Sequence, residues 1–272
     1  MTSKLRTLFR RTGLRQSQLA VRMCCERNVL AVATRFGIGS HARTTGRILC
    51  YHAVGQPLWG VNNITPERFR RHLDLALAAG YRFVPASELA RTGGAPNELA
   101  ITFDDGLKSV LTTAAPILAD YGVPWSLFVV SDWVDGHHFW ADRTDDVLLT
   151  WDDVERLAAA GADVGSHSVT HARFGTLDLD QMIDELELSR ETIEARIGIR
   201  TSSFAIPFGQ SGDWPAAAQA AAQAAGYTEI YAQAEETRPP GTVARTFVTR
   251  FDGDQIFQAA LAGAFDYWEE AG

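Results

Sequence analysis

Two neighbouring carboxylates are the first residues of this chain whose types and spacing could do chemistry. Asp104 and Asp105 follow an alternating apolar stretch at 99–103 and precede Gly106, where the chain can turn. Neighbours on a regular strand point to opposite faces, so this turn is what would let both carboxylates serve one site. Because each carboxylate resists ionisation beside the other, a cation bound there would relieve their repulsion.

Two histidines supply the remaining ligands that such a cation would need. His167 and His171 lie four residues apart, directly after a second apolar alternation at 162–165. Neutral imidazole is the commonest ligand of zinc-like metals, and three protein ligands with one open position are typical of catalytic zinc. We therefore expect Asp105, His167 and His171 to bind a metal, and Asp104 to stay free as a base that activates water. Either pair alone would more often be a turn or a coincidence of spacing.

Three segments in this order resemble the NodB-homology polysaccharide deacetylases. Each segment is weak by itself, but their joint order and spacing are specific. The resemblance extends over most of the chain, from about Leu49 to Tyr227. The segments are Thr-Phe-Asp-Asp-Gly at 102–106, His-Ser-x-x-His at 167–171 and Phe-Ala-Ile-Pro-Phe-Gly at 204–209. The resemblance implies an α/β fold, an irregular (β/α)7-type barrel related to the TIM barrel.

The resemblance also implies roles for particular residues. It makes Asp104 the catalytic base and Asp105 a metal ligand together with the two histidines. It assigns the backbone N–H of Phe208 as the donor to the oxyanion of the tetrahedral intermediate. Pro207 and Gly209 would shape that loop where substrate binds.

Two positions depart from the family pattern. Many members place a general-acid histidine near the C-terminus, but no histidine follows His171 here, and His52 after the first predicted strand is the best substitute. The alternative is that His52 is a hydrogen-bonded core histidine. Many members also carry an arginine that orients the base at the position of Ala205. Arg245 or Arg250 could replace it, and Arg245 is favoured; both could instead be surface residues of an edge strand.

An aromatic loop between the carboxylates and the histidines offers a candidate sugar contact. Trp140, with Phe139, would form a wall that stacks on a pyranose, although such aromatics more often pack in the core or at its rim. His137 and His138 in the same loop are expected to be exposed, with metal ligation by one of them as the alternative.

The elements that must position these residues follow a strand–helix alternation from Arg47 onward. Repeated βα units predict a parallel sheet covered by helices, and the metal candidates all follow predicted strands, where barrel folds place their sites. Thr65 and Thr150 are predicted helix N-caps. We expect strands at 47–51, 82–84, 99–103, 124–130, 162–167, 203–207, 228–231 and 243–251, and helices at 66–80, 110–121, 151–161, 177–197, 214–226 and 256–268.

Composition fits a globular protein with a sizeable core. The chain has 272 residues, of which 46% are hydrophobic and 21% charged, and no apolar run reaches the length of a membrane span. We divide it into a basic helical N-terminal arm at 1–45 and a deacetylase-like domain at 46–272. Three cysteines, two of them adjacent, do not form a disulfide framework.

Charge is distributed unevenly along the chain. Residues 1–47 carry net +9 and the remainder carries net −17. A basic arm on an acidic body indicates peripheral contact with an anionic membrane or an acidic partner; a solvated leader is the alternative. The acidic body argues against nucleic acid as a partner. The arm lacks the long apolar stretch of a secretory signal, so we expect a cytoplasmic protein that contacts the inner membrane peripherally.

Together these residues predict a metal-dependent hydrolase that removes N-acetyl groups from a sugar. The substrate would be a cell-envelope glycan, an exopolysaccharide or its precursor, and the metal most readily Zn²⁺, although Co²⁺, Ni²⁺ and Fe²⁺ suit the same ligands. One alternative is another amide or ester hydrolase on this scaffold, such as a deformylase or an O-acetyl esterase. The other is a catalytically degenerate carbohydrate-binding protein.

Overall fold

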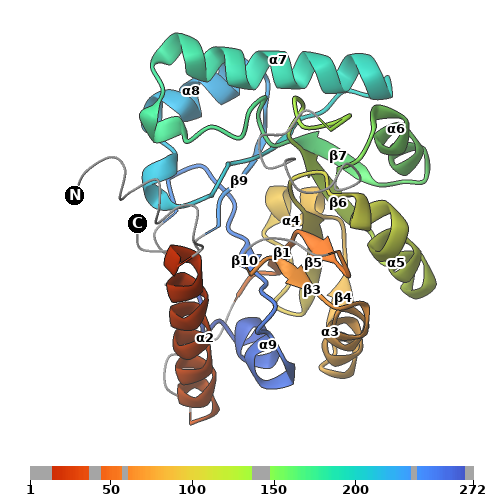
Figure 1. The fold of residues 1–272 in the computed structure, drawn as a ribbon, viewed down its shortest axis with the longest axis vertical. Helices are drawn as coiled ribbons and strands as arrows, with labels where there is room; N and C mark the ends of the chain where they lie inside the picture. The colour runs from red at the N-terminus through yellow and green to blue at the C-terminus, as the bar shows by residue number, and fades with distance from the viewer. Residues whose placement is uncertain (1–13, 37–43, 57–60, 137–147, 234–237, 267–272) are drawn as a thin grey trace.

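One curled parallel sheet forms the centre of the molecule (Figure 1). The computed structural model describes residues 14–36, 44–56, 61–136, 148–233 and 238–266. The strands are β1 (Arg47–Tyr51), β4 (Arg82–Phe83), β5 (Glu98–Phe103), β6 (Trp125–Val129), β7 (Asp163–Ser166), β8 (Ser203–Ala205), β9 (Glu229–Tyr231) and β10 (Thr246–Phe247). Their order is β10-β1-β5-β6-β7-β8-β9, with β4 added beside β5, and every pairing is parallel. A separate short pair joins β2 (Ala53–Val54) to β3 (Asn63–Ile64).

Strand register brings the ends of distant strands to one edge of the sheet. Tyr51 of β1 pairs with Phe103 of β5, so the residues that follow them, His52 and Asp104, leave the sheet side by side. Ser166 pairs with Val129 and with Phe204, which places His167 at the same edge. The carboxyl ends of parallel strands therefore gather the residues that sequence reasoning selected.

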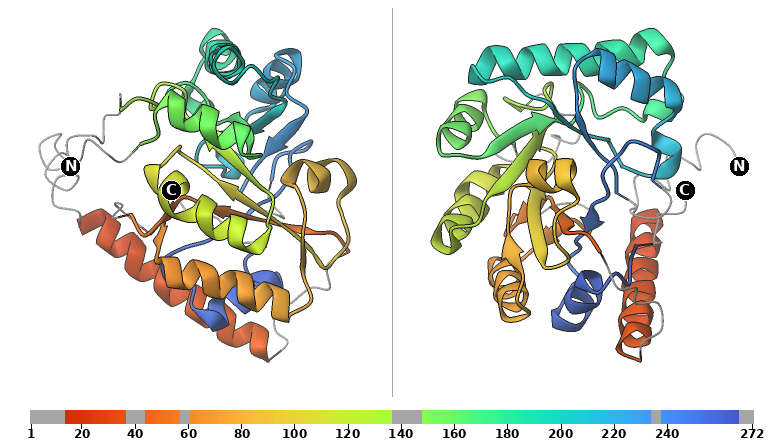
Figure 2. Two further views of the ribbon diagram at one scale, coloured as in Figure 1. Left: turned by 90° about the vertical axis from the view of Figure 1, so that its right-hand side faces the viewer. Right: turned by 180° about the vertical axis from the view of Figure 1, so that it is seen from behind.

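Helices cover the outside of the curled sheet (Figures 1 and 2). The strands they cover are buried along their whole length in β1 and β5, as expected for a parallel sheet packed on both faces. The helices are α2 (Leu14–Arg35), α3 (Pro66–Ala78), α4 (Ala86–Thr92), α5 (Ala115–Tyr121, preceded by a π-helical turn at Val110–Ala114), α6 (Trp151–Ala159), α7 (Leu179–Ile197), α8 (Ala216–Ala224) and α9 (Asp254–Leu261).

Local sequence signals account for most of these boundaries. The Thr65 side chain accepts the Arg68 N–H at the start of α3, and Thr150 forms a reciprocal capping box with Asp153 at the start of α6. Gly122 ends α5 in the left-handed conformation at φ 64°. The parallel sheet covered by helices, predicted from the alternation of strands and helices, is confirmed, and so is the barrel-type α/β fold that the resemblance implied.

Three local expectations differ from the structure. The helix expected at 256–268 is α9, which begins at Asp254 and already ends at Leu261. The alternating stretch at 243–251 forms only the two-residue strand β10, because the chain turns at Thr249–Asp252, where Thr249 donates a hydrogen bond to the Asp252 carboxylate. Helix α4 was not predicted, since its seven residues carry too little periodicity to distinguish it from a loop.

Helix α2 packs on the rest of the fold and lies beside α9, as two opposite views of the molecule show (Figures 1 and 2). Its Arg27 is fully buried and grips Asp252 with two nitrogens, one of them Nε at 2.8 Å. The same guanidinium donates to the Phe247 carbonyl at 3.1 Å. A buried bidentate pair of this kind is costly to break from one side, because the partner charge is left without compensation.

We predict that Arg27→Ala lowers the free energy of unfolding by about 3–5 kcal/mol, because Asp252 then stays buried and unpaired. Arg22→Ala is the matched control, since Arg22 lies on the same helix in an exposed pair with Glu26. It should cost no more than about 1 kcal/mol. Urea denaturation followed by circular dichroism measures both. Equal costs would show that α2 is not part of the cooperative fold.

Candidate active site

Four polar side chains meet at the carboxyl edge of the sheet. Asp104 and Asp105 follow β5, His167 follows β7, and His171 closes the short loop after His167. Asp105 Oδ1 lies 3.6 Å from Nε2 of His167 and 3.6 Å from Nε2 of His171. The structure thus brings together the three residues predicted as metal ligands, with their ligand atoms within 4.8 Å of one another.

The three side chains fit a divalent cation. Asp105 Oδ1 is buried and has no hydrogen-bond partner among the described residues, although it points at both imidazoles. His167 Nδ1 donates to the Ala205 carbonyl at 2.7 Å, which leaves Nε2 as the ring's acceptor atom. Tetrahedral ligands about 2.1 Å from one ion lie roughly 3.4 Å apart, close to the separations found here.

The electrostatics of Asp105 agree with a site that awaits positive charge. Burial raises the pKa of Asp105 to about 6, and the neighbouring Asp104 charge adds to the rise, while His167 opposes it. A buried carboxylate that resists ionisation in this way gains most from a bound cation.

Strained backbone surrounds the site. Asp105, Ser168, His171 and Phe208 all adopt left-handed φ angles, between 62° and 74°. Non-glycine residues in that region cost of order 1–3 kcal/mol each, and such residues concentrate where function requires a particular side-chain direction. At Asp105 this conformation is the turn that lets adjacent carboxylates face one pocket.

The loop between the two histidines is held by a residue that sequence reasoning missed. Glu185 of α7 accepts the backbone N–H groups of Val169 and Thr170, both at 2.9 Å, and also the Thr170 hydroxyl. Glu185 lies fourteen residues after His171 in an ordinary acidic helix, so nothing in the sequence distinguishes it from its neighbours.

Serine hydroxyls complete the support of this loop. Ser168 Oγ accepts the His171 N–H at 2.9 Å, and Ser166 Oγ accepts the Ser168 N–H at 3.1 Å. Ser166 also contacts Ser189 of α7 at 2.7 Å. Both ends of the strained loop are therefore tied to α7, and His171 is fixed relative to His167.

Asp104 is held by the arginine expected to orient it. Arg245 Nη1 and Nη2 donate to the two Asp104 oxygens at 2.6 and 2.7 Å, and both side chains are buried. Arg245 thus supplies to Asp104 the positive charge that an alanine at position 205 cannot provide. Arg250, the other candidate, is exposed. Burial by itself would raise the pKa of Asp104, but the charge of Arg245 and its hydrogen bonds hold that pKa well below its usual range.

His52 lies at the same rim. Its Nε2 is 4.0 Å from Asp105 Oδ2, its ring packs edge-on against Phe247 with centroids 5.5 Å apart, and its buried Nδ1 has no described partner. Burial lowers the pKa of His52 to about 4, and Arg245 acts in the same direction against the attraction of Asp104. His52 is therefore neutral near pH 7.

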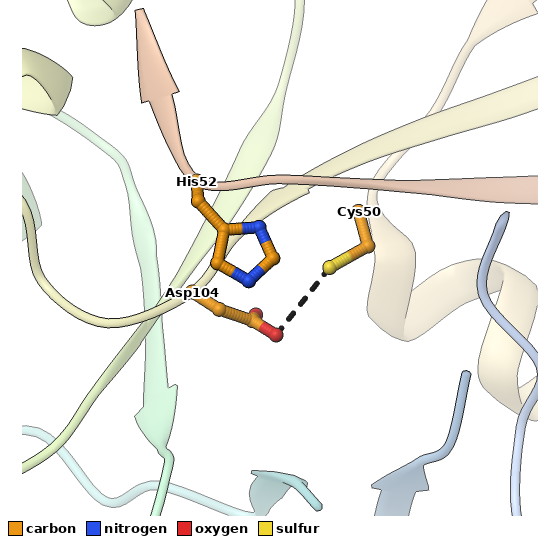
Figure 3. A group of neighbouring side chains, drawn as sticks. All are labelled: Cys50, His52 and Asp104. Carbon is orange, nitrogen blue, oxygen red and sulfur yellow. Dashed lines mark hydrogen bonds between the residues drawn. The ribbon is translucent and has the colours of Figure 1, made fainter. Parts of the chain in front are cut away.

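Cys50 approaches Asp104 from the strand that carries His52 (Figure 3). Its sulfur lies 3.4 Å from Asp104 Oδ2, and Cys50, His52 and Asp104 form a second cluster of metal-ligand types. Burial raises the pKa of the Cys50 thiol well above its ordinary value, so the soft thiolate ligand is disfavoured. Arg245 already neutralises Asp104, so Asp105, His167 and His171 are the better metal site.

The segment predicted to supply the oxyanion donor lies beside the metal triad. The Phe208 ring packs on His171 with centroids 4.7 Å apart, and the Arg173 guanidinium lies 3.7 Å from the centre of the Phe208 ring. Pro207 is buried. Gly209 is irreplaceable, because its φ is 69° and a Cβ there would lie 2.9 Å from the Gln233 side chain.

The predicted sugar-stacking residue, Trp140, lies outside the described residues, as do Phe139, His137 and His138. An aromatic neighbour of the site that was not predicted is Trp133, whose ring centroid is 5.0 Å from that of His171. Trp133 and the partly exposed Phe208 flank the second histidine.

Comparison with known proteins identifies the family. The polysaccharide deacetylase family matches residues 92–230, just over half of the chain. YxkH of Bacillus subtilis (strain 168), which is named after the same family, is 24% identical over 170 residues, covering 60% of this chain and 56% of YxkH. The chain thus spans just over half the length of that relative. It belongs to the polysaccharide deacetylases, a family of hydrolases that act on carbon–nitrogen bonds other than peptide bonds.

Solved structures share the fold. IcaB from Ammonifex degensii aligns with a TM-score of 0.65 at 22% identity, over 82% of this chain and 97% of that one. A de-N-acetylase from Aggregatibacter actinomycetemcomitans aligns with a TM-score of 0.68 at 19% identity, over 79% and 99%. The deacetylase PplD of Streptococcus pyogenes, solved with acetate, aligns with a TM-score of 0.65 at 18% identity, over 76% and 93%.

We predict that Glu185→Ala weakens zinc binding by about 10–100-fold, as is usual when a residue that orients a ligand is removed. The strained loop would lose three acceptor contacts and His171 its fixed position. Glu187→Ala on the exposed side of the same helix is the matched control and should leave the affinity unchanged. Titration of zinc against a chromophoric chelator measures both. An unaltered affinity in Glu185→Ala would remove Glu185 from this role.

Proposed function

We propose that this protein is a metal-dependent N-deacetylase of a glycan. The observation that carries the proposal is the buried Oδ1 of Asp105, which faces two imidazoles and has no hydrogen-bond partner among the described residues. Beside it lies a second carboxylate, that of Asp104, which is ion-paired with Arg245. One carboxylate is arranged to receive a cation and its neighbour is kept ionised, which are the requirements of metal-assisted hydrolysis.

Asp105, His167 and His171 would hold the cation. Bound there, it would act as a Lewis acid toward the acetyl carbonyl and acidify a water molecule. Zinc suits two imidazoles and one carboxylate best, and cobalt, nickel or iron would fit the same donors. Family membership supports metal dependence without identifying the metal.

Asp104 is proposed as the base that accepts the proton of the attacking water. Its lowered pKa keeps it ionised, and Arg245 fixes both of its oxygens while leaving further lone pairs free to accept. The backbone N–H of Phe208 is proposed to donate to the oxyanion formed at the acetyl carbon.

His52 is proposed to protonate the leaving nitrogen. Its low pKa makes it neutral at rest. It would receive the proton that Asp104 takes from the water, since both side chains belong to one cluster, and pass that proton to the leaving nitrogen. The carbon–nitrogen bond then breaks, releasing a free amine on the sugar and acetate. Its position at the rim occupied by Asp104 and Asp105 supports this role.

The substrate is proposed to be an N-acetylated sugar in a cell-envelope glycan, an exopolysaccharide or its precursor. The family supports a polysaccharide, and one of the similar solved structures is a de-N-acetylase. Pro207 and Gly209 would shape the binding loop, and Trp140 stays a proposed sugar contact. An O-acetyl esterase or deformylase would use the same residues, so the acyl group must be determined by substrate comparison.

We predict that the purified protein releases acetate from N-acetylglucosamine oligomers, and that chelation abolishes the release and zinc restores it. Asp104→Asn should lower kcat by about 10²–10⁴-fold while elemental analysis still finds the metal, because the base is not one of the proposed ligands. Loss of metal in Asp104→Asn would reverse the roles of the two carboxylates. Bound metal without acetate release from any N-acetylated glycan would overturn the proposed activity.

We predict that Arg245→Met moves the acid limb of the kcat/KM profile to higher pH. Without the guanidinium, burial is left to raise the pKa of Asp104, so the base becomes protonated at a pH where the parent enzyme is still active. Arg250→Met, which removes an exposed arginine from the same segment, is the control and should leave the profile unchanged. If the acid limb of Arg245→Met does not shift, Arg245 does not set the pKa of the catalytic base.

Charge also supports a location for the protein. We infer that residues 1–45 contact an anionic membrane peripherally, from the cytoplasm, since this region carries nine of the chain's 25 basic residues and only one acid, Glu26. Within the part of the chain that the structure describes, no helix combines the length and apolarity needed to cross a bilayer.

A further inference from the structure

Helix α2 is apolar on two opposite faces. Its inner face is buried against the domain through Ala20, Met23 and Ala31, with Arg27 among them. Its outer face carries a row of apolar side chains at successive spacings of four, four, three and four residues, which keeps them on one side of the helix. We call this row the outer stripe; it consists of Val21, Cys25, Val29, Val32 and, just past the helix end, Phe36.

The outer stripe is open to solvent. Val21 is 64% exposed, Val29 67%, Val32 52% and Phe36 77%, and Cys25 is exposed as well. These four large side chains are nearly half of the nine that are exposed in the described part of the chain. Single exposed apolar residues are ordinary, but a contiguous row of them marks a contact surface.

The net charge of the N-terminal segment that includes α2 favours an anionic partner. Arg15, Arg22 and Arg35 lie on α2 itself, and residues 1–13 add Lys4, Arg6, Arg10 and Arg11 without any acid. Beyond residue 47 the chain carries net −17. An anionic surface would attract the helix and repel the body, so approach is favoured only with α2 foremost.

We propose that α2 docks on an anionic lipid bilayer, with the outer stripe buried at the boundary between head groups and acyl chains. An interfacial helix has an apolar face flanked by arginine and lysine, and it lies in the plane of the membrane without spanning it. This rests on the peripheral membrane contact proposed above and assigns that contact to four residues of α2 and to Phe36 just beyond its end.

A second copy of the chain is a poorer occupant of the outer stripe. A stable interface uses about 20–30 residues a side, and the outer stripe offers five. Two copies would also bring together two segments of net +9 each. A lipid surface needs no matching shape and gains from the same charge.

The docked helix would hold the catalytic rim near the membrane. Ala20 and Met23 of the inner face form a cluster with Phe247, whose ring packs on His52. Arg27 also donates to the Phe247 carbonyl. The Phe247 side chain alone thus separates α2 from His52. The geometry points to a substrate glycan that is lipid-linked or lies at the membrane surface.

Point substitutions test the docking better than removal of α2, which would leave Asp252 buried without Arg27. The double variant Val29→Gln/Val32→Gln makes the outer stripe polar at exposed positions. The matched control is Leu188→Gln/Ile199→Gln, which changes two side chains that are 50% and 57% exposed on another part of the surface. Substitutions at such exposed positions should leave folding intact.

The full chain is sedimented with vesicles of equimolar phosphatidylcholine and phosphatidylglycerol, and with phosphatidylcholine alone. We expect the parent and the Leu188→Gln/Ile199→Gln control to bind the anionic vesicles, and the Val29→Gln/Val32→Gln variant to bind at least about tenfold more weakly. Absence of parent binding, or equal binding by both double variants, would overturn the proposal. A dimer of the parent that Val29→Gln/Val32→Gln dissociates would assign the outer stripe to a second copy instead.

Acetate release from a soluble oligosaccharide separates this proposal from the proposed function. Both double variants should match the parent in that assay, since neither changes a residue of the site. Failure of acetate release by the parent from every N-acetylated glycan tried, soluble or lipid-linked, with intact vesicle binding would refute the deacetylase and leave the docking standing. Failure of vesicle binding with intact acetate release would do the reverse.

Discussion

The buried ion pair between Asp104 and Arg245 is the interaction on which the rest of the site depends. Two adjacent carboxylates at the end of a buried strand repel each other, and burial makes both charges costly. Arg245 removes that cost for Asp104 through two hydrogen bonds. Asp105 is left without an equivalent partner, as the rise in its pKa shows. Asp104 is fixed and ionised because it reaches Arg245, and Asp105 needs a cation because it does not.

Positioning around this pair relies on strained backbone held by neighbouring helices. Left-handed φ angles at Asp105, Ser168, His171 and Phe208 aim side chains and peptide groups inward. Glu185 of α7 offsets part of that strain by accepting three hydrogen bonds from the loop between the histidines. The site is therefore a property of the sheet edge together with α7, and the ligands are only its innermost layer.

The N-terminal helix is joined to the same structure from the opposite side. Arg27 grips the turn at Asp252 and the Phe247 carbonyl, and the segment between Arg245 and Asp252 thus contacts Asp104, His52 and α2 in succession. A helix that sequence reasoning treated as an arm contributes a fully buried charge to the catalytic domain. The outer side of the helix, with its exposed apolar stripe, is the part that we propose to meet an anionic surface.

The sequence by itself determined the fold class, most element boundaries and the two motifs that supply Asp104, Asp105, His167 and His171. These follow from short-range rules: caps such as Thr65 and Thr150, alternation along strands, and the convergence of parallel strand ends. Contacts between residues far apart in the chain were decided only by the tertiary structure. Only packing distinguishes Arg245 from Arg250 as the partner of Asp104, and Glu185 from the other acids of its helix. Only packing shows which apolar face of α2 is buried and which is exposed. The reason is that such contacts depend on distances in space, which local spacing along the chain does not encode.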